Sequence, residues 1–199
     1  SVALAKKMTR LGASALIAEG GESGGHIGET TTMALVPQVT SAVTIPVIAA
    51  GGIATGEDIA RFMALGASAV QMGSIFVPTE ECDASVEFKK VYLNAHREDI
   101  RIIQSPVGMP GRAFDGEFIR NVAEGKEKPR SCPFHCIKTC DYTKSPYCII
   151  KALYNAARGD MKKGYAFAGG NAYLSDKIRS VREVVEKLKT DFFLSKAAF

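Results

Sequence analysis

The chain has 199 residues, of which 46% are apolar and 23% are charged. This composition is that of an ordinary globular protein, and it excludes a disordered, collagen-like or low-complexity chain. Five cysteines are too few for a disulfide-stapled secreted scaffold. No apolar run approaches the roughly 20 residues of a membrane-spanning helix. These features predict a reduced, cytoplasmic setting without a membrane partner.

Charge is distributed unevenly along the chain. Residues 1–85 carry 4 basic and 8 acidic side chains, whereas residues 86–199 carry 21 basic and 13 acidic ones. The basic residues of the second part alternate with acidic ones, as on solvated helix faces, so no nucleic-acid partner is expected. The chain opens on a helical spacing of apolar residues without an initiator Met or a signal peptide, and we expect it to lack upstream residues.

Residues 1–85 predict the alternating helices and strands of a parallel α/β fold. Three short apolar runs have the length and the apolarity of strands that are covered on both faces. These strands are residues 13–18, 45–50 and 68–72. Gly12 and Gly66 stand where the residue after a helix C-cap is found, and a strand follows each of them. Helices are therefore expected before and between the strands.

Two of the expected helices carry residues that bear on where they begin. Thr55, with Asp58 three residues later, resembles a capping box at the start of a helix that runs to residue 65. Pro37 fits two descriptions, because it is either the first residue of a short helix or a kink in a longer helix that begins near Thr31. The sequence leaves both descriptions open.

A glycine-rich loop follows each predicted strand. The loops are residues 20–28, 51–56 and 73–76. In parallel α/β folds, the loops that leave the C-terminal strand ends gather on one face and carry the functional site. No G-x-G-x-x-G motif follows a strand, so a TIM (βα)8 barrel fits better than a Rossmann sheet. The fold class expected for residues 1–85 is α/β, the C-terminal part of such a barrel, with the other strands upstream.

Residues 86–199 predict a less regular, mainly helical extension that packs on the barrel. The expected helices are residues 86–96, 147–158 and 176–189. A proline- and glycine-rich loop is expected at 105–113, a cysteine-dense turn at 132–148, and a loop with two glycines at 168–173.

Two of the glycine-rich loops have the residues of a phosphate cradle. Gly51 and Gly52 follow one strand, and Gly73 and Ser74 follow the next. Such residues offer backbone N–H groups, a hydroxyl and a helix N-terminus to a dianion. Either pair alone indicates only a tight turn, but two pairs on successive strands are typical of the last two strands of a barrel. Gln71, on the preceding strand, is placed to hydrogen-bond an edge of the bound cofactor.

His26 is the candidate catalytic residue. A loop histidine by itself is more often solvated or structural. Gly24 and Gly25 precede it, and adjacent glycines allow the backbone to pass close to a flat ligand while presenting the next side chain to it. A neutral imidazole at this position can abstract a proton or polarise a substrate oxygen.

Three segments together resemble one enzyme family. Residues 18–28 (AEGGESGGHIG), 45–56 (IPVIAAGGIATG) and 69–76 (AVQMGSIF) closely resemble the flavin-dependent nitronate monooxygenases, formerly called 2-nitropropane dioxygenases. The flavin-type enoyl-acyl-carrier-protein reductases are their sister family. The resemblance continues more loosely through 105–113 and 166–173. It implies an FMN-containing TIM barrel, of which this chain would hold the last three strands.

The same resemblance implies roles for individual residues. His26 matches the family's active-site histidine. The positions that match flavin-binding residues are Gly24, Gly25, Gly51, Gly52, Gln71, Gly73 and Ser74. Asn171 and Tyr173 are weaker candidates for the substrate side of the flavin.

Two reactions are compatible with this resemblance. In the favoured reaction, an alkyl nitronate is oxidised with O2 to a carbonyl compound and nitrite, and His26 orients or deprotonates the substrate. In the alternative, NAD(P)H is the electron donor for an FMN-dependent enoyl-acyl-carrier-protein reductase, and acyl carrier protein is a partner. Glu19 stands where the reductases have Glu, whereas the extension after residue 85 resembles the monooxygenase branch. Either enzyme acts on a small-molecule substrate, and a homodimer is compatible with both.

Four cysteines form the pattern C-x3-C-x3-C-x7-C. They are Cys132, Cys136, Cys140 and Cys148. Four thiols in so short a segment can ligate an iron–sulfur cluster or zinc, but the spacing matches neither a zinc ribbon nor a ferredoxin. The favoured interpretation is that they are reduced thiols in a small subdomain, so no metal ligand is predicted. A non-enzymatic metal or redox module is a third hypothesis for the protein.

Overall fold

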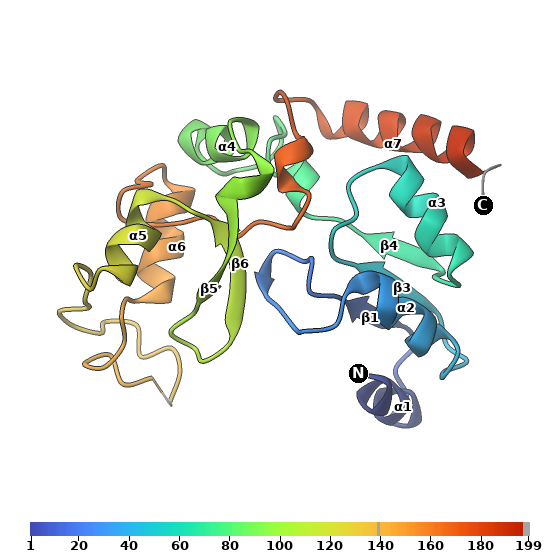
Figure 1. The fold of residues 1–199 in the computed structure, drawn as a ribbon, viewed down its shortest axis with the longest axis horizontal. Helices are drawn as coiled ribbons and strands as arrows, with labels where there is room; N and C mark the ends of the chain where they lie inside the picture. Colours follow the sequence, from blue (N-terminus) through green and yellow to red (C-terminus); the bar gives the residue numbers. More distant parts are fainter. Residues whose placement is uncertain (139, 197–199) are drawn as a thin grey trace.

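A parallel sheet forms from the N-terminal part of the chain. The computed structural model describes residues 1–138 and 140–196. The strands are β1 (Leu16–Glu19), β3 (Val47–Ala50) and β4 (Ala69–Gln71). They pair in the order β1-β3-β4, and both pairs are parallel (Figure 1). Each strand overlaps one of the three predicted strands, which confirms the α/β pattern. The C-terminal ends of the three strands therefore lie at one edge of the sheet.

Helices precede and separate these strands, as predicted. They are α1 (Val2–Arg10), α2 (Thr32–Thr40) and α3 (Gly56–Ala64). The predicted capping box opens α3, because the Asp58 N–H donates to Thr55 Oγ1 at 3.1 Å and the Thr55 N–H donates to the Asp58 carboxylate at 3.0 Å. Pro37 lies inside α2, whose N-cap is Thr31, so the longer of the two alternative helices is the one that forms.

The core of this part packs between the sheet and its helices. Its most deeply buried side chains are Val36, Val39, Val47 and Ala49. Gly12 and Gly66 follow the helix C-caps with φ of 92° and 94°, the left-handed conformation that the sequence predicts there. These turns set the chain direction from each helix into the next strand.

A second, antiparallel sheet links distant parts of the chain. Its strands are β2 (Gly25–His26), β5 (Ile100–Gln104) and β6 (Pro110–Phe114). They pair in the order β2-β6-β5, with His26 opposite Gly111. β2 belongs to the first glycine-rich loop, and the hairpin of β5 and β6 belongs to the extension. The hairpin therefore supports the loop that carries His26.

The prediction of a loop over 105–113 is wrong in its second half, because 110–113 belong to β6. Pro110 opens its strand, where a missing N–H is tolerated. Gly111 leaves room for the ring of Phe167, since an added Cβ would stand 2.8 Å from Phe167 Cε1. Local composition favours a loop here, but hydrogen bonds to two neighbouring strands stabilise the extended backbone.

Four further helices follow the parallel sheet. They are α4 (Val86–Leu93), α5 (Glu117–Ala123), α6 (Ile149–Ala157) and α7 (Val181–Ser195). The last helix begins later than the predicted residue 176, because Ser180 and Glu183 form a capping box. α7 packs on α3, where a Cβ added to Gly56 would stand 2.2 Å from the Phe192 nitrogen. The sequence did not predict α5.

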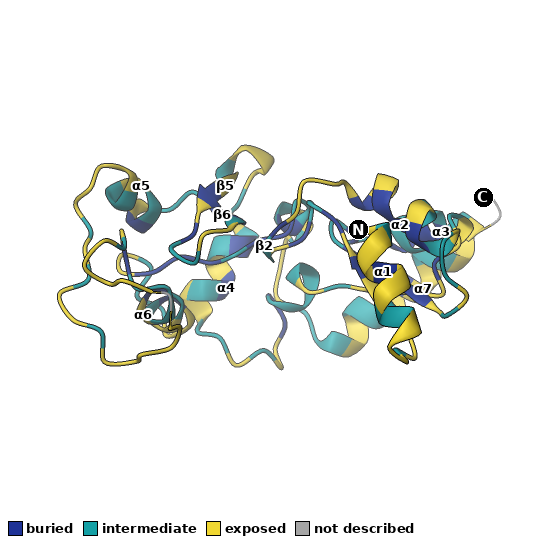
Figure 2. Cartoon of the chain, turned by 90° about the horizontal axis from the view of Figure 1, so that it is seen from below, coloured by how far each residue is buried: buried dark blue, intermediate teal, exposed yellow. Residues whose placement is uncertain are grey.

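The elements fall into two groups along the molecule. Figure 2 shows α1, α2, α3 and α7 at one end and α5, α6, β5 and β6 at the other, with β2 between them. None of the described helices is long and apolar enough to cross a membrane.

Candidate functional site

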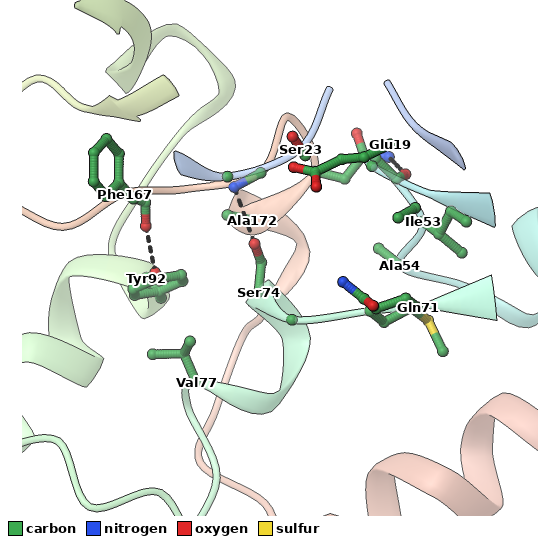
Figure 3. Close-up of a pocket in the computed structure, with 18 residues that line it drawn as sticks. Glu19, Ser23, Ile53, Ala54, Gln71, Ser74, Val77, Tyr92, Phe167 and Ala172 are labelled. Atoms are coloured by element: carbon green, nitrogen blue, oxygen red, sulfur yellow. Dashed lines mark hydrogen bonds between the residues drawn. The ribbon is translucent and has the colours of Figure 1, made fainter. Parts of the chain in front are cut away.

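A cavity of about 290 Å³ lies at the C-terminal ends of β1, β3 and β4 (Figure 3). All three glycine-rich loops contribute to its wall. The predicted site residues that line it are Gly24, Gly51, Gly52, Gln71, Gly73, Ser74 and Asn171. The lining does not include Gly25, His26 or Tyr173. Most of the candidate flavin positions are thus brought together around one space, while the histidine lies just beyond it.

The glycines at the ends of β3 and β4 present free backbone donors. Gly51 and Gly52 have φ of 107° and 71°, a conformation that side chains other than glycine rarely adopt. A Cβ added to Gly51 would stand 2.8 Å from Thr32 Oγ1. Within the described residues, the N–H groups of Gly51, Gly52 and Gly73 donate no hydrogen bond to protein. These donors are available to the oxygens of an anionic ligand.

Ser23 adds a hydroxyl to the same cavity. Its side chain is buried, its Oγ has no hydrogen-bond partner among the described residues, and the residue lines the cavity. A buried polar atom without a partner costs free energy, on the order of 1–3 kcal/mol. A ligand with polar atoms would remove this cost. Ser23 therefore marks the cavity as a place for a polar ligand.

The segment 168–172 ties the three glycine-rich loops together. The Gly169 N–H donates to Ser74 Oγ at 3.0 Å, and the Gly170 N–H donates to the Glu22 carbonyl at 2.8 Å. Asn171 Nδ2 donates to the Gly52 carbonyl at 2.5 Å. Each contact reaches the loop after a different strand of the parallel sheet. The segment that the sequence marks as a ligand loop thus also holds the cavity wall in place.

His26 is held by a residue that sequence reasoning missed. A hydrogen bond of 2.8 Å joins its Nε2 to Ser105 Oγ, and Ser105 is buried at the end of the β5 strand. The ring of His26 also meets Phe167 edge-on, at 5.4 Å between centroids. Phe167 lines the cavity, so the imidazole contacts a wall residue without lining the cavity itself. The two contacts fix the orientation of the ring.

Tyr92 was not predicted as a site residue either. It comes from α4, lines the cavity, and donates from its hydroxyl to the Phe167 carbonyl at 2.6 Å (Figure 3). Burial, with a smaller effect from Cys82, raises the pKa of this phenol above its ordinary value. It is therefore a neutral hydrogen-bond donor that positions Phe167. A helical tyrosine carries no sequence signal for such a role. Phe167 had a local signal, because it lies two residues before the glycine pair of 168–173.

The four clustered cysteines lie away from this cavity but close to one another. All five cysteines are free thiols. Desolvation, followed by the proximity of Cys136, Cys132 and Cys148, raises the pKa of the Cys140 thiol. Among the described residues, no three side chains of His, Cys, Asp or Glu already surround a position for a metal ion.

Known proteins resemble the chain in sequence and in fold. A probable nitronate monooxygenase of Staphylococcus aureus (strain Newman) is 34% identical over 188 residues, which cover 89% of this chain and 53% of the relative. The structure of FabK from Thermotoga maritima has a TM-score of 0.84 and 37% identity, covering 100% of this chain and 60% of that one. A nitroalkane oxidase from Streptomyces ansochromogenes has a TM-score of 0.78 and 27% identity, covering 100% of this chain and 57% of that one.

The chain spans only part of these relatives. Its matches cover from 29% to 53% of the curated relatives' own lengths. Nevertheless, the sequence profile of the nitronate monooxygenase family matches residues 1–191, which is nearly the whole chain. This chain therefore belongs to the nitronate monooxygenase family.

Proposed function

We propose that the protein is an FMN-dependent oxidoreductase of the nitronate monooxygenase type. Its substrate would be an alkyl nitronate, oxidised with O2 to a carbonyl compound and nitrite. The observation that carries this proposal is the cavity at the strand ends, where glycine N–H groups and the Ser23 hydroxyl lack protein partners. Family membership supports the same class of chemistry.

The residues around the cavity fit FMN. The phosphate would bind at the N–H groups of Gly51, Gly52 and Gly73, beside the Ser74 hydroxyl. Gln71 lines the same space and would hydrogen-bond an edge of the ring system. When bound, FMN supplies the two-electron redox chemistry, and the protein supplies position and hydrogen bonds.

Gly24 would let the flat ring lie close to the backbone. A Cβ added to it would stand 2.9 Å from the Ala168 carbonyl carbon, so the two backbone segments approach each other without room for a side chain. Gly24 also lines the cavity, so the backbone of this closely packed pair forms part of the surface on which a planar ligand would lie.

His26 would act on the substrate, and Ser105 would hold the His26 ring in position. A neutral imidazole takes a proton from the carbon next to a nitro group, or donates to a nitronate oxygen, depending on which form of the substrate binds. The 2.8 Å contact from Nε2 to Ser105 Oγ leaves Nδ1 as the nitrogen that is open to other partners. Phe167 lines the cavity and its ring meets the His26 imidazole edge-on, so a substrate in the cavity would reach His26 beside Phe167.

An enoyl-acyl-carrier-protein reductase is the second candidate. Glu19 lines the cavity, and it is the residue that the sister family has at this position. The likeness to FabK from Thermotoga maritima also covers the whole of this chain. In this case NAD(P)H would reduce the flavin, and the substrate would be an enoyl thioester.

Anaerobic titration of the complete protein separates the two reactions. The flavin absorbance is followed while an alkyl nitronate is added and, in a separate cuvette, while NADH or NADPH is added. We expect bleaching by the nitronate and little response to the nicotinamides. Fast bleaching by a nicotinamide with no response to nitronate would transfer the assignment to the reductase, and a protein that binds no flavin would refute both.

A His26→Asn variant tests the assignment of the histidine. It should keep the flavin spectrum, because His26 does not line the cavity, and it should lose most of the nitronate-dependent bleaching. Full bleaching at the wild-type rate would mean that His26 has no part in the reaction.

A further inference from the structure

A second, smaller cavity gathers all four clustered cysteines. It has a volume of about 20 Å³, and most of its lining residues come from the segment between α5 and α6. Figure 1 draws this segment at the lower left. The thiols that line it are Cys132, Cys136, Cys140 and Cys148. The fifth cysteine, Cys82, does not line this cavity. The regular pattern in the sequence therefore corresponds to one place in the structure.

The backbone of this segment turns so that the thiols share one wall. His135 adopts φ of 45°, and it is the one residue other than glycine with positive φ in the part of the chain that the structure describes. The turn stands between Cys132 and Cys136. Cys148 is the N-cap of α6 and lines the same cavity. The turn at His135 and the start of α6 thus bring cysteines from both ends of the segment to one place.

The rest of the wall is uncharged. Besides cysteine, the lining holds proline, serine, tyrosine and aliphatic side chains, including Val107, Ile137 and Ile149. None of the described lining residues is acidic, basic or a histidine. Four thiolates here would have no compensating charge from the described lining residues, and the four cysteines supply its sulfur ligands. A set of thiolates in apolar surroundings selects thiophilic metals.

We propose that Cys132, Cys136, Cys140 and Cys148 bind a thiophilic metal centre, either an iron–sulfur cluster or a zinc ion. Both take four thiolate ligands from short loops. In the described residues no three of these thiols yet surround one position. Metal binding would therefore draw the exposed Cys136 and Cys140 and the half-buried Cys132 and Cys148 toward one centre, and it would cross-link a segment with little regular secondary structure. This site is separate from the flavin cavity, and it goes beyond the proposed redox reaction.

Contacts between packed side chains connect the cysteine cavity to the flavin cavity. Tyr147 lines the cysteine cavity and meets Tyr165 at 5.7 Å between ring centroids. Tyr165 meets Phe167 at 5.1 Å, and Phe167 lines the flavin cavity. Val107, in the cysteine cavity wall, donates its N–H toward Ser105 Oγ, the partner of His26. Ordering of the cysteine segment would therefore stabilise the residues that hold the catalytic histidine.

Metal analysis of the complete protein tests the proposal. The protein is purified without a polyhistidine tag and without chelators, under argon, and metals and acid-labile sulfide are measured. We expect about four iron and four sulfide per chain if the centre is a cluster. We expect about one zinc per chain if it is a single ion. A protein that holds neither metal, and takes up neither Zn²⁺ nor iron with sulfide on reconstitution, overturns the proposal.

Two variants locate the metal. The Cys136→Ser/Cys140→Ser variant should retain less than about a tenth of the wild-type metal. Cys82→Ser is the matched control and should retain all of it, because Cys82 does not line the cavity. Undiminished metal in the double variant would place the ion elsewhere and refute the site. Circular dichroism shows whether each variant is folded.

Thiol accessibility gives a readout that does not depend on variants. With the centre bound, a thiol reagent should react with Cys82 alone under native conditions, and with all five cysteines after acid treatment and denaturation. Reaction of the clustered thiols in the native, metal-loaded protein would refute ligation. A shortfall of thiols after denaturation, reversed only by a reductant, would show a disulfide in place of a metal. None of these measurements depends on nitronate, so the metal site and the proposed reaction can fail independently.

Discussion

The cavity has two walls that hold a ligand in different ways. Toward the parallel sheet the wall is backbone, where Gly51 and Gly52 present N–H groups at the end of β3. On the opposite side the wall is made of side chains from distant segments. Tyr92 comes from α4, and Phe167 comes from the segment before η3 (Ala172–Leu174). The first wall can bind a ligand because its residues have no side chains. The second wall relies on particular atoms of its side chains.

This difference leads to different expected responses to substitution. At the backbone wall, any side chain meets protein atoms and forces the loop out of its conformation. At the side-chain wall, removal of one polar atom leaves the fold intact and weakens a single contact. The following substitutions, ordered from the largest expected effect to the smallest, test this contrast.

Gly51→Ala should have the largest effect. The residue has φ of 107°, and the new Cβ would stand 2.8 Å from Thr32 Oγ1 and 3.0 Å from the Ser23 nitrogen. We expect FMN binding to weaken at least about 100-fold and stability to fall by about 1–3 kcal/mol. Flavin fluorescence titration and thermal unfolding measure the two effects.

Gly28→Ala is the control for this substitution, because Gly28 lies in the first glycine-rich loop with open space around it. It should behave as wild type. If Gly51→Ala binds FMN as tightly as Gly28→Ala does, the backbone wall is not the phosphate site.

Ser105→Ala should have the next largest effect, and it should affect turnover without affecting flavin content. Loss of the hydroxyl frees the His26 ring to rotate, and one hydrogen bond of about 1–1.5 kcal/mol corresponds to about a tenfold loss of kcat/KM. A purely structural role for Ser105 would lower stability and leave kcat/KM unchanged.

The backbone wall could be predicted from the sequence because its information is local. A short apolar run followed by two glycines indicates a buried strand and a turn with left-handed backbone, and Gly51 and Gly52 have that conformation. The capping box of Thr55 and Asp58 was predictable for the same reason. Parallel strand order then places the loops together, so convergence follows from the fold class.

The side-chain wall could not be predicted, because its contacts join residues far apart in the chain. Ser105 meets His26, and Tyr92 meets Phe167, across separations that no local pattern records. The β5–β6 hairpin was missed for a related reason, since the prolines and glycines of 105–113 indicate a loop until a partner strand is known. The role of Asn171 as a cross-link to Gly52 likewise appears only in three dimensions.

Asn171→Ala should have a smaller effect than the first two changes. It removes the donor to the Gly52 carbonyl and leaves the glycine itself in place. We expect FMN to bind about fivefold more weakly, since one neutral hydrogen bond contributes about 1 kcal/mol. Asn171→Asp should be worse, because a carboxylate would face the carbonyl oxygen. A change in KM for nitronate with unchanged FMN affinity would instead assign Asn171 to the substrate.

Tyr92→Phe should have the smallest effect, and one that depends on pH. The variant loses the hydrogen bond to the Phe167 carbonyl but keeps the ring, so stability should fall by about 1 kcal/mol, or about 2–4 °C in Tm. Tyr154→Phe, at an exposed position, is the control.

The pKa of Tyr92 is raised by burial, so its neutral form is favoured in the folded state. The stability that this phenol contributes is complete below the ordinary tyrosine pKa of about 10 and is lost as pH rises above it. Wild-type stability should therefore fall more steeply than that of Tyr92→Phe between about pH 10 and 11, because the variant has one fewer buried phenol to ionise. Parallel curves for the two proteins over this range would show that Tyr92 is solvated in the folded state, and the side-chain wall would then be looser than its hydrogen bonds imply.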